Sequence, residues 1–101
     1  MIARLWHGTT RNEVADEYLA YLLSSGVADY RATPGNLDVR ILRRREDRIT
    51  HFLIVSTWES LQAIEAFAGA DLTLARYYPK DEQYLLTREA RVQHYEIAAS
   101  S

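Results

Sequence analysis

Three side chains in this sequence could carry acid–base chemistry and hold an anion. His7 stands near the end of an apolar segment, and an imidazole that titrates close to neutral pH can take a proton from a phenol or an enol. Arg76 offers a cation for an oxyanion, and Tyr77 beside it offers a hydrogen-bond donor. We therefore predict that these three residues are catalytic. The alternatives are a histidine that only bonds the backbone and an aromatic plug with its arginine at the surface.

A second group of residues is rich in aromatic rings and could line the pocket for such chemistry. Aromatic rings stack on aromatic ligands, and indole, phenol and imidazole groups also form hydrogen bonds. The predicted substrate-binding residues are Trp6, Trp58, Phe67, Tyr78, Tyr84 and His94. Trp58 lies at a junction between a strand and a helix, so it also fits the role of a packing anchor.

Neither a metal site nor a phosphate site is expected. The three histidines are His7, His51 and His94, and no pair of them has the spacing of a recognisable metal motif, so we predict no bound metal. The run of arginines at 43–45 could bind an anion. Acidic residues follow it at once, however, and a charge run of mixed sign favours a solvated hairpin.

Two amphipathic helices are expected to position the candidate residues. The first spans residues 11–25, because apolar residues recur there at intervals of three or four after a capping-box pattern at 10–13. Gly26 can end this helix. The second spans residues 60–68, and Gly69 can end it.

Strands are expected between and around these helices. Pro34 and Gly35 have the chemistry of a type II turn, and apolar and charged residues alternate directly after them, from 37 to 41. The charged stretch at 43–48 favours a hairpin into a strand at 49–58. The other expected elements are a strand at the N-terminus, a short turn of helix capped by Asp71, a helical turn within 81–86 and a final strand at 91–98.

This order of elements is β-α-β-β-α-β, which predicts an α+β, ferredoxin-like fold with a four-stranded antiparallel sheet. The stretch from Phe52 to Val55 is apolar at consecutive positions, so both faces of that strand avoid water. Two helices can cover only one face of such a sheet. We therefore expect a second copy of the chain to cover the other face, which makes the protein a homodimer.

Length and charge limit the remaining possibilities. A chain of 101 residues suits one domain, expected over residues 1–98, with a frayed tail at 99–101. A net charge of −2 gives no general attraction to nucleic acid. No apolar run approaches the ~18 residues that span a bilayer. With no cysteine and no signal-peptide pattern, we expect a cytoplasmic protein without a membrane partner.

The segment from Phe52 to Phe67, which reads FLIVSTWESLQAIEAF, resembles a strand, Trp-Glu-Ser signature and helix of the antibiotic-biosynthesis-monooxygenase-like family. The resemblance implies a dimeric α/β barrel and a cofactor-independent monooxygenase. Such an enzyme oxidises a phenolic, quinol or polyketide-like aromatic substrate with O₂, because the substrate anion itself reduces dioxygen. His7, Arg76 and the adjacent tyrosines would then supply the proton acceptor and the anion site.

The resemblance also includes a branch that degrades haem, and this chain departs from its pattern. That branch uses an asparagine, a tryptophan and a histidine, and this sequence has His7, Phe67 and Tyr77 at the corresponding places. Haem cleavage is therefore not expected, although a tyrosinate at Tyr77 could ligate iron. Two further alternatives are a non-catalytic dimer that binds haem or another hydrophobic ligand and a structural dimerisation module.

Overall fold

The computed structural model describes residues 1–100 and contains three long strands built on alternating patterns. They are β1 (Ile2–Arg11), β2 (Asn36–Glu46) and β3 (Ile49–Trp58). On β3 every second residue from Thr50 to Trp58 is buried, which confirms the strand predicted at 49–58. The turn before β2 is also confirmed, because Gly35 has a φ of 92° and the Asn36 amide donates to the Thr33 carbonyl at 3.2 Å.

The helices agree with the sequence prediction less well. They are η1 (Asn12–Val14), α1 (Ala15–Ser24), α2 (Gly26–Ala32), α3 (Leu61–Ala68) and α4 (Asp81–Tyr84). The predicted capping box is wrong, because β1 continues to Arg11 and the Thr10 hydroxyl donates to the Arg11 carbonyl. Gly26 does not end the first helical segment but begins α2. For α3 the prediction is confirmed: the Ser60 side chain caps it and Gly69 follows its last residue.

The sheet has the strand order β2-β3-β1-β4, which is the ferredoxin-like order that the sequence predicts. The fourth position holds two short strands that lie one after the other along the same edge of β1, and each of them is antiparallel to β1. Strand β4 (Leu85–Arg88) pairs with residues 8–10, and β5 (Gln93–Glu96) pairs with residues 2–5. The final strand predicted at 91–98 is present but shorter, as β5 at 93–96. Strand β4 is not predicted, and residues 85 and 86 belong to it rather than to a helical turn. Of the predicted tail, residue 101 lies outside the described residues.

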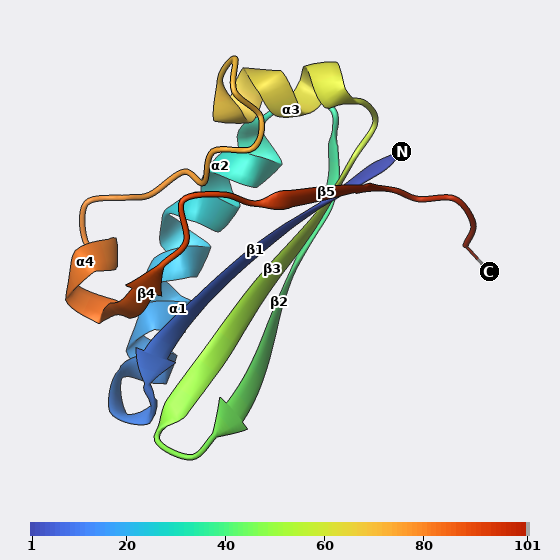
Figure 1. Ribbon diagram of the computed structural model, residues 1–101. Coiled ribbons are helices and arrows are strands. Elements are labelled where there is room, and N and C mark those ends of the chain that lie inside the picture. Colours follow the sequence, from blue (N-terminus) through green and yellow to red (C-terminus); the bar gives the residue numbers. More distant parts are fainter. Residues whose placement is uncertain (101) are drawn as a thin grey trace.

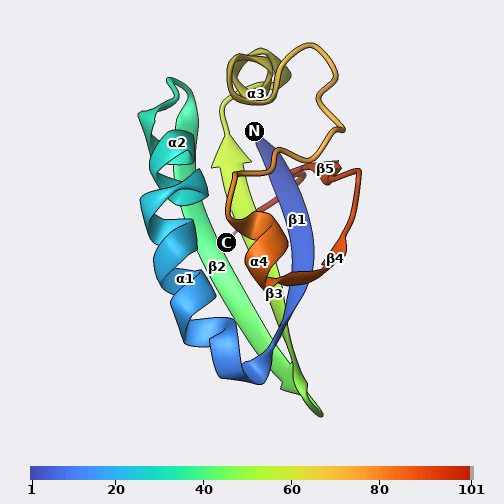
Figure 2. The ribbon, with the colours of Figure 1, turned by 90° about the vertical axis from the view of Figure 1, so that its left-hand side faces the viewer.

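All the long helical segments on the sheet cover one of its faces. In Figure 1, α1, α2 and α4 lie to the left of the strands, and the view in Figure 2 shows α1 and α2 as one column alongside β2. The buried apolar residues of this layer are Trp6, Ala15, Tyr18, Leu22, Tyr30, Phe52, Ile54, Trp58, Ile64 and Phe67. None of the helices within residues 1–100 is long and apolar enough to cross a membrane.

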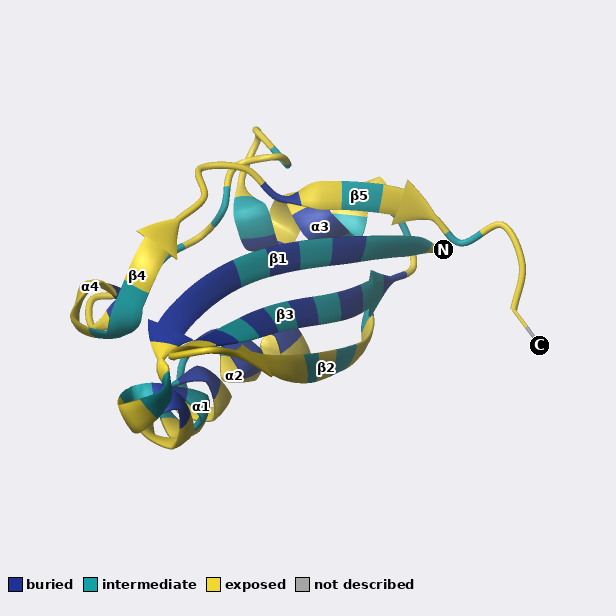
Figure 3. Cartoon of the chain, turned by 60° about the horizontal axis from the view of Figure 1, so that its bottom comes forward, coloured by how far each residue is buried: buried dark blue, intermediate teal, exposed yellow. Residues whose placement is uncertain are grey.

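The other face of the sheet carries apolar side chains that no helix within residues 1–100 covers. Side chains of neighbouring strands that face each other in register share a face, and Leu5 is paired with Val55 while His7 is paired with Leu53. Figure 3 shows buried and half-buried residues alternating along β1 and β3, as expected when one face is covered and the other is not. The apolar residues of this uncovered face are Leu5, Leu42, Leu53, Val55 and Tyr95.

Candidate functional site

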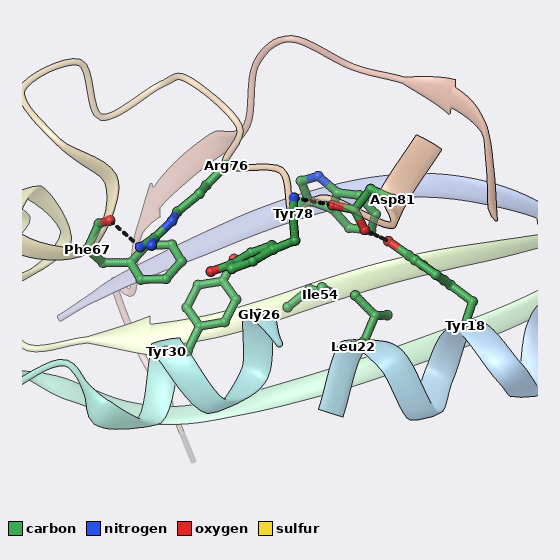
Figure 4. A pocket seen from close by; sticks show the side chains of 10 residues that line it. Tyr18, Leu22, Gly26, Tyr30, Ile54, Phe67, Arg76, Tyr78 and Asp81 are labelled. Atoms are coloured by element: carbon green, nitrogen blue, oxygen red, sulfur yellow. Dashed lines mark hydrogen bonds between the residues drawn. The ribbon is translucent and has the colours of Figure 1, made fainter. Parts of the chain in front are cut away.

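A small cavity lies between the helices and the sheet. Its volume is about 20 Å³, enough for roughly one water molecule. Figure 4 shows its walls, in which β-strand residues meet residues of α1 and α2 and of the segment Arg76–Asp81, called the strap below. The lining residues are Trp6, Tyr18, Leu22, Gly26, Tyr30, Ile54, Phe67, Arg76, Tyr78 and Asp81. The cavity is therefore aromatic and nearly filled by the protein's own side chains.

Asp81 brings a carboxyl group to this apolar cavity. The residue is 3% exposed, and one oxygen accepts a hydrogen bond from the Tyr18 hydroxyl at 3.2 Å. The other oxygen accepts from the Tyr78 amide at 2.6 Å. Burial raises the pKa of Asp81 above its ordinary value of 3.8, because a carboxylate is poorly solvated there. A carboxylate with a raised pKa is a better proton acceptor than an ordinary one.

The partner of Asp81 keeps its own proton. Burial and then the nearby Asp81 carboxylate raise the pKa of the Tyr18 phenol. The phenol therefore remains a hydrogen-bond donor over the ordinary pH range, and it orients the carboxylate without competing for the proton of a ligand. Tyr18 comes from the buried face of α1 and Asp81 from the start of α4, so the fold brings together residues far apart in sequence.

The strap closes the cavity through contacts with Asp29 of α2. The Tyr78 hydroxyl donates to the Asp29 carboxylate at 2.7 Å, and the Arg76 guanidinium lies 3.4 Å from the same oxygen. The Tyr78 ring packs against Gly26. Arg76 also donates to the Phe67 carbonyl at 3.0 Å and lies over the Phe67 ring. The Arg76 and Asp29 side chains of this ion pair are both nearly half-exposed.

Four of the predicted site residues line the cavity: Trp6, Phe67, Arg76 and Tyr78. Tyr77 lies beside it, with its ring edge-on to Trp6 and its hydroxyl donating to the Glu89 carbonyl. The other predicted residues lie further from the cavity. They are Tyr84, which packs against Tyr18 and Tyr21, Trp58, which packs against Tyr30 and Phe67, and His94, which faces Arg4.

His7 does not join these residues, contrary to the sequence expectation. Its side chain lies on the uncovered face of the sheet, where it contacts Glu89 and His51. The physical reason is the strand period of two: Trp6 points to the helices, so the next residue points away. The predicted catalytic set of His7, Arg76 and Tyr77 is therefore not assembled on one side of the sheet.

Asp81 and Tyr18 are site residues that the sequence prediction misses. The periodicity places Tyr18 only on the apolar face of a helix, and Asp81 only in a helical turn. One signal in the sequence could have indicated the site. Tyr18 stands on the apolar, buried face of a helix, and a buried tyrosine hydroxyl needs a polar partner. The identity of that partner depends on the course of the strap, which no local pattern reveals.

His94 illustrates how a titratable group here can be structural. Its Nε2 atom lies 3.0 Å from the guanidinium of Arg4, which is itself 1% exposed. Arginine can only donate, so His94 accepts and is neutral. Burial and then the charge of Arg4 lower the pKa of His94.

We expect this contact to make the protein less stable in mild acid. Because the pKa of His94 is lower in the folded state, its contribution is present above the ordinary value of 6.5 and is lost as the pH falls through the folded pKa. Urea unfolding at a series of pH values measures this slope. In His94→Gln, which retains an acceptor that does not titrate, the slope should be smaller. An identical slope in the two proteins would contradict the assignment.

The residues at the site do not fit haem. The Tyr77 hydroxyl, the expected iron ligand, is already bonded to the Glu89 carbonyl, and burial raises its pKa, which disfavours a tyrosinate. No group of three or more metal-ligating side chains occurs within residues 1–100.

The fold and the site together define a small α+β, ferredoxin-like protein with a small aromatic cavity that holds a buried carboxyl group. The chain belongs to the antibiotic biosynthesis monooxygenase family, whose sequence model matches residues 1–75. This confirms the family resemblance of the Trp-Glu-Ser segment. Comparison with curated proteins finds no match.

Solved structures share the fold over the whole chain. Rv0793 from Mycobacterium tuberculosis has 18% sequence identity and a TM-score of 0.67, with 99% of this chain and 97% of that chain covered. The heme-degrader MhuD from the same organism, solved with two hemes bound, has 18% identity and a TM-score of 0.61 over 100% and 99%. An antibiotic biosynthesis monooxygenase assigned in Bacillus cereus has 14% identity and a TM-score of 0.67 over 99% and 95%.

Proposed function

We propose that the protein is a cytoplasmic, cofactor-independent monooxygenase that oxidises a phenolic, quinol or polyketide-like aromatic substrate with O₂. The observation that carries this proposal is the buried Asp81 carboxyl group in an aromatic cavity. A core that served packing alone would gain stability from an apolar residue at this position. Family membership is consistent with such a reaction, since the family is named for monooxygenases.

In the proposed reaction the protein prepares the substrate and dioxygen does the oxidation. The Asp81 carboxylate takes the acidic proton of the substrate, and the resulting anion is held by the Arg76 guanidinium and the Tyr78 hydroxyl. The anion then gives its electrons to O₂ and forms a C–O bond to a peroxide, which takes up the proton held by Asp81. The O–O bond breaks as the same carbon loses its remaining hydrogen, so that one oxygen atom stays on carbon as a carbonyl and the other leaves as water. The aromatic walls exclude bulk water, which would otherwise stabilise the anion against oxidation.

The substrate can enter only if the strap moves. A ligand the size of an aromatic polyketide needs several hundred Å³, whereas the closed cavity has about 20 Å³. If the contacts of Arg76 and Tyr78 with Asp29 break, the Tyr78 ring can move away from Gly26. This movement would open the cavity on the side of α2. The same two residues are then free to meet the substrate anion.

Oxygen consumption tests the proposal directly. A panel of hydroquinones, anthrones and simple phenols is incubated with the protein in the presence of a metal chelator, and O₂ uptake is followed with an electrode. We expect uptake with at least one compound class and one atom of ¹⁸O from ¹⁸O₂ in the product. No uptake above the rate without protein across the panel would refute the proposal.

One observation favours a second candidate, a non-catalytic dimerisation module. The cavity is nearly filled by its own aromatic side chains, as expected for a core without a ligand. In that case aromatic compounds would leave the amide NMR signals of the strap unchanged. If the protein is the proposed enzyme, binding should shift the signals of residues 76–81 and of α2.

We also propose that two copies assemble through the uncovered face of the sheet. Leu5, Leu53 and Val55 form its centre, and an apolar stripe of this kind is normally covered. A charge buried between the copies is unfavourable, so Leu53→Lys should raise the dimer dissociation constant about a hundredfold or more. Sedimentation velocity measures this effect. The control is Leu23→Lys, which changes a 54%-exposed leucine of α1 and should leave the dimer intact. A wild-type protein that sediments as a monomer would contradict the proposal.

A further inference from the structure

Four titratable side chains form a continuous chain across the uncovered face of the sheet. His7 on β1 contacts Glu89, which follows β4, through Nδ1. Its Nε2 atom lies 3.0 Å from Nδ1 of His51 on β3, and Nε2 of His51 lies 3.1 Å from the carboxylate of Glu46 at the end of β2. Both histidines also line a groove of about 310 Å³ on this face. None of the four residues lines the cavity of the candidate active site.

The two imidazole rings meet end to end. Their planes differ by only 21° and their centres are 5.2 Å apart, while the facing nitrogens are 3.0 Å apart. Because the ring centres are much further apart than the two facing nitrogens, these nitrogens must lie close to the line that joins the ring centres. This is the geometry of an N–H···N hydrogen bond, in which one nitrogen donates and the other accepts. A metal ion would instead require the two lone pairs to converge on a point beside that line.

A count of hydrogens determines the charge of the pair. The chain contains three contacts, from Glu89 to His7, from His7 to His51 and from His51 to Glu46, and each needs one hydrogen. Ionised carboxylates supply none, and two neutral imidazoles supply only two. All three bonds therefore form only when the histidine pair holds one additional proton. Hydrogen bonds from His51 and Arg44 lower the pKa of Glu46, which keeps that carboxylate ionised.

The neighbouring charges favour a single additional proton. Arg44 on β2 lies 3.3 Å from the Glu46 carboxylate. Arg43 and Arg88 are engaged elsewhere, by Asp16 and Glu82. The side chains that face the pair from β1, β3 and β4 are otherwise uncharged: Thr9, Leu53 and Thr87. Glu46, Glu89 and Arg44 together leave one negative charge, and the shared proton neutralises it.

We propose that His7 and His51 form a binding site for one shared proton and that this site couples assembly of two copies to pH. With one proton the chain is fully bonded and the face is neutral, so a second copy can cover it. With a second proton, two N–H groups point at each other and the face becomes positive. With no additional proton, one of the three hydrogen bonds of the chain is lost and the face becomes negative. Covering a net charge costs more than covering a neutral face. The coupling rests on the dimer proposed above.

The dependence of assembly on pH tests this coupling. We expect the dimer dissociation constant of the wild type to be lowest at an intermediate pH and to rise at least tenfold on both sides between about pH 5 and pH 9. In the double variant His7→Gln/His51→Gln, whose amides bond each other without titrating, the dependence should be flat. The matched control is His94→Gln, which changes the histidine on the helical side and should keep the bell shape.

Nitrogen NMR of the imidazoles provides a readout that does not depend on assembly. At the pH of strongest association, the two rings together should carry three N–H hydrogens, and the facing nitrogens should show a coupling through the hydrogen bond. Two or four ring hydrogens at that pH would overturn the shared proton. A monomer at every pH would overturn both the dimer and its coupling, and a flat curve for a wild-type dimer would overturn the coupling alone.

Discussion

Replacement of Asp81 by asparagine should abolish most of the oxygenase activity while leaving the fold intact. The amide cannot accept a substrate proton, and the loss of a positioned general base lowers kcat/KM by about 10²–10⁴-fold. Asparagine has nearly the same shape, so its oxygen can still accept from the Tyr78 amide and its NH₂ group can donate to the Tyr18 oxygen. Initial rates of O₂ uptake measure the effect. The control is Glu82→Gln, which changes the neighbouring exposed acid and should keep the activity within about twofold.

The same variant should be at least as stable as the wild type near neutral pH. Because the pKa of Asp81 is raised in the folded state, its contribution to stability is present below the ordinary value of 3.8 and is lost as the pH rises through the folded pKa. The asparagine side chain of the variant does not titrate and avoids this loss. In urea unfolding, the stability difference between variant and wild type should therefore grow in favour of the variant as the pH rises above 3.8 and level off once the pH exceeds the folded pKa of Asp81. Equal activity in the two proteins would remove Asp81 from the mechanism.

Replacement of Trp58 by alanine should unfold the protein or bring it close to unfolding. Trp58 is fully buried, its ring packs against Tyr30 and Phe67, and its indole N–H donates to the Ser56 hydroxyl at 2.9 Å. Removal of such a side chain costs about 3–5 kcal/mol, and a domain of this size has only ~5–15 kcal/mol in total. Urea unfolding followed by circular dichroism measures the loss.

Two further variants make this stability result specific. Trp58→Phe retains most of the ring and should lose clearly less than the alanine variant. Leu61→Ala, at a position that is 49% exposed on α3, should change the unfolding free energy by less than about 0.5 kcal/mol. A loss below about 1 kcal/mol for Trp58→Ala would show that the ring is not the packing anchor.

Elements with a local signal can be predicted from the sequence. The bounds of strand β3 follow from apolar residues at consecutive positions, and those of α3 from Ser60 and Gly69 at its ends. The strand β4 could not be predicted, since its four residues pair only through contacts with β1. The continuation of helix at Gly26 has no signal either, because glycine favours a helix end unless tertiary packing decides otherwise.

The candidate site is predictable in composition but not in arrangement. Arg76 and Tyr78 can be identified because a cation and a phenol stand together in a bend, and both line the cavity. The position of His7 depends on strand parity, and a shift of one residue moves a side chain to the other face. The position of Asp81 depends on the path of the strap, which the contacts with Asp29 determine.

The arginines of β2 have a consequence for how the protein behaves at high concentration. β2 forms the outer boundary of the sheet, with one row of backbone groups that no strand within residues 1–100 pairs with. Such a row can template the addition of foreign strands and start a fibril. The side chains at 40 and 43–45 are all arginine and are exposed along this row, and charged side chains on an edge strand disfavour pairing with a foreign strand. The basic run thus keeps the open edge from growing into aggregates.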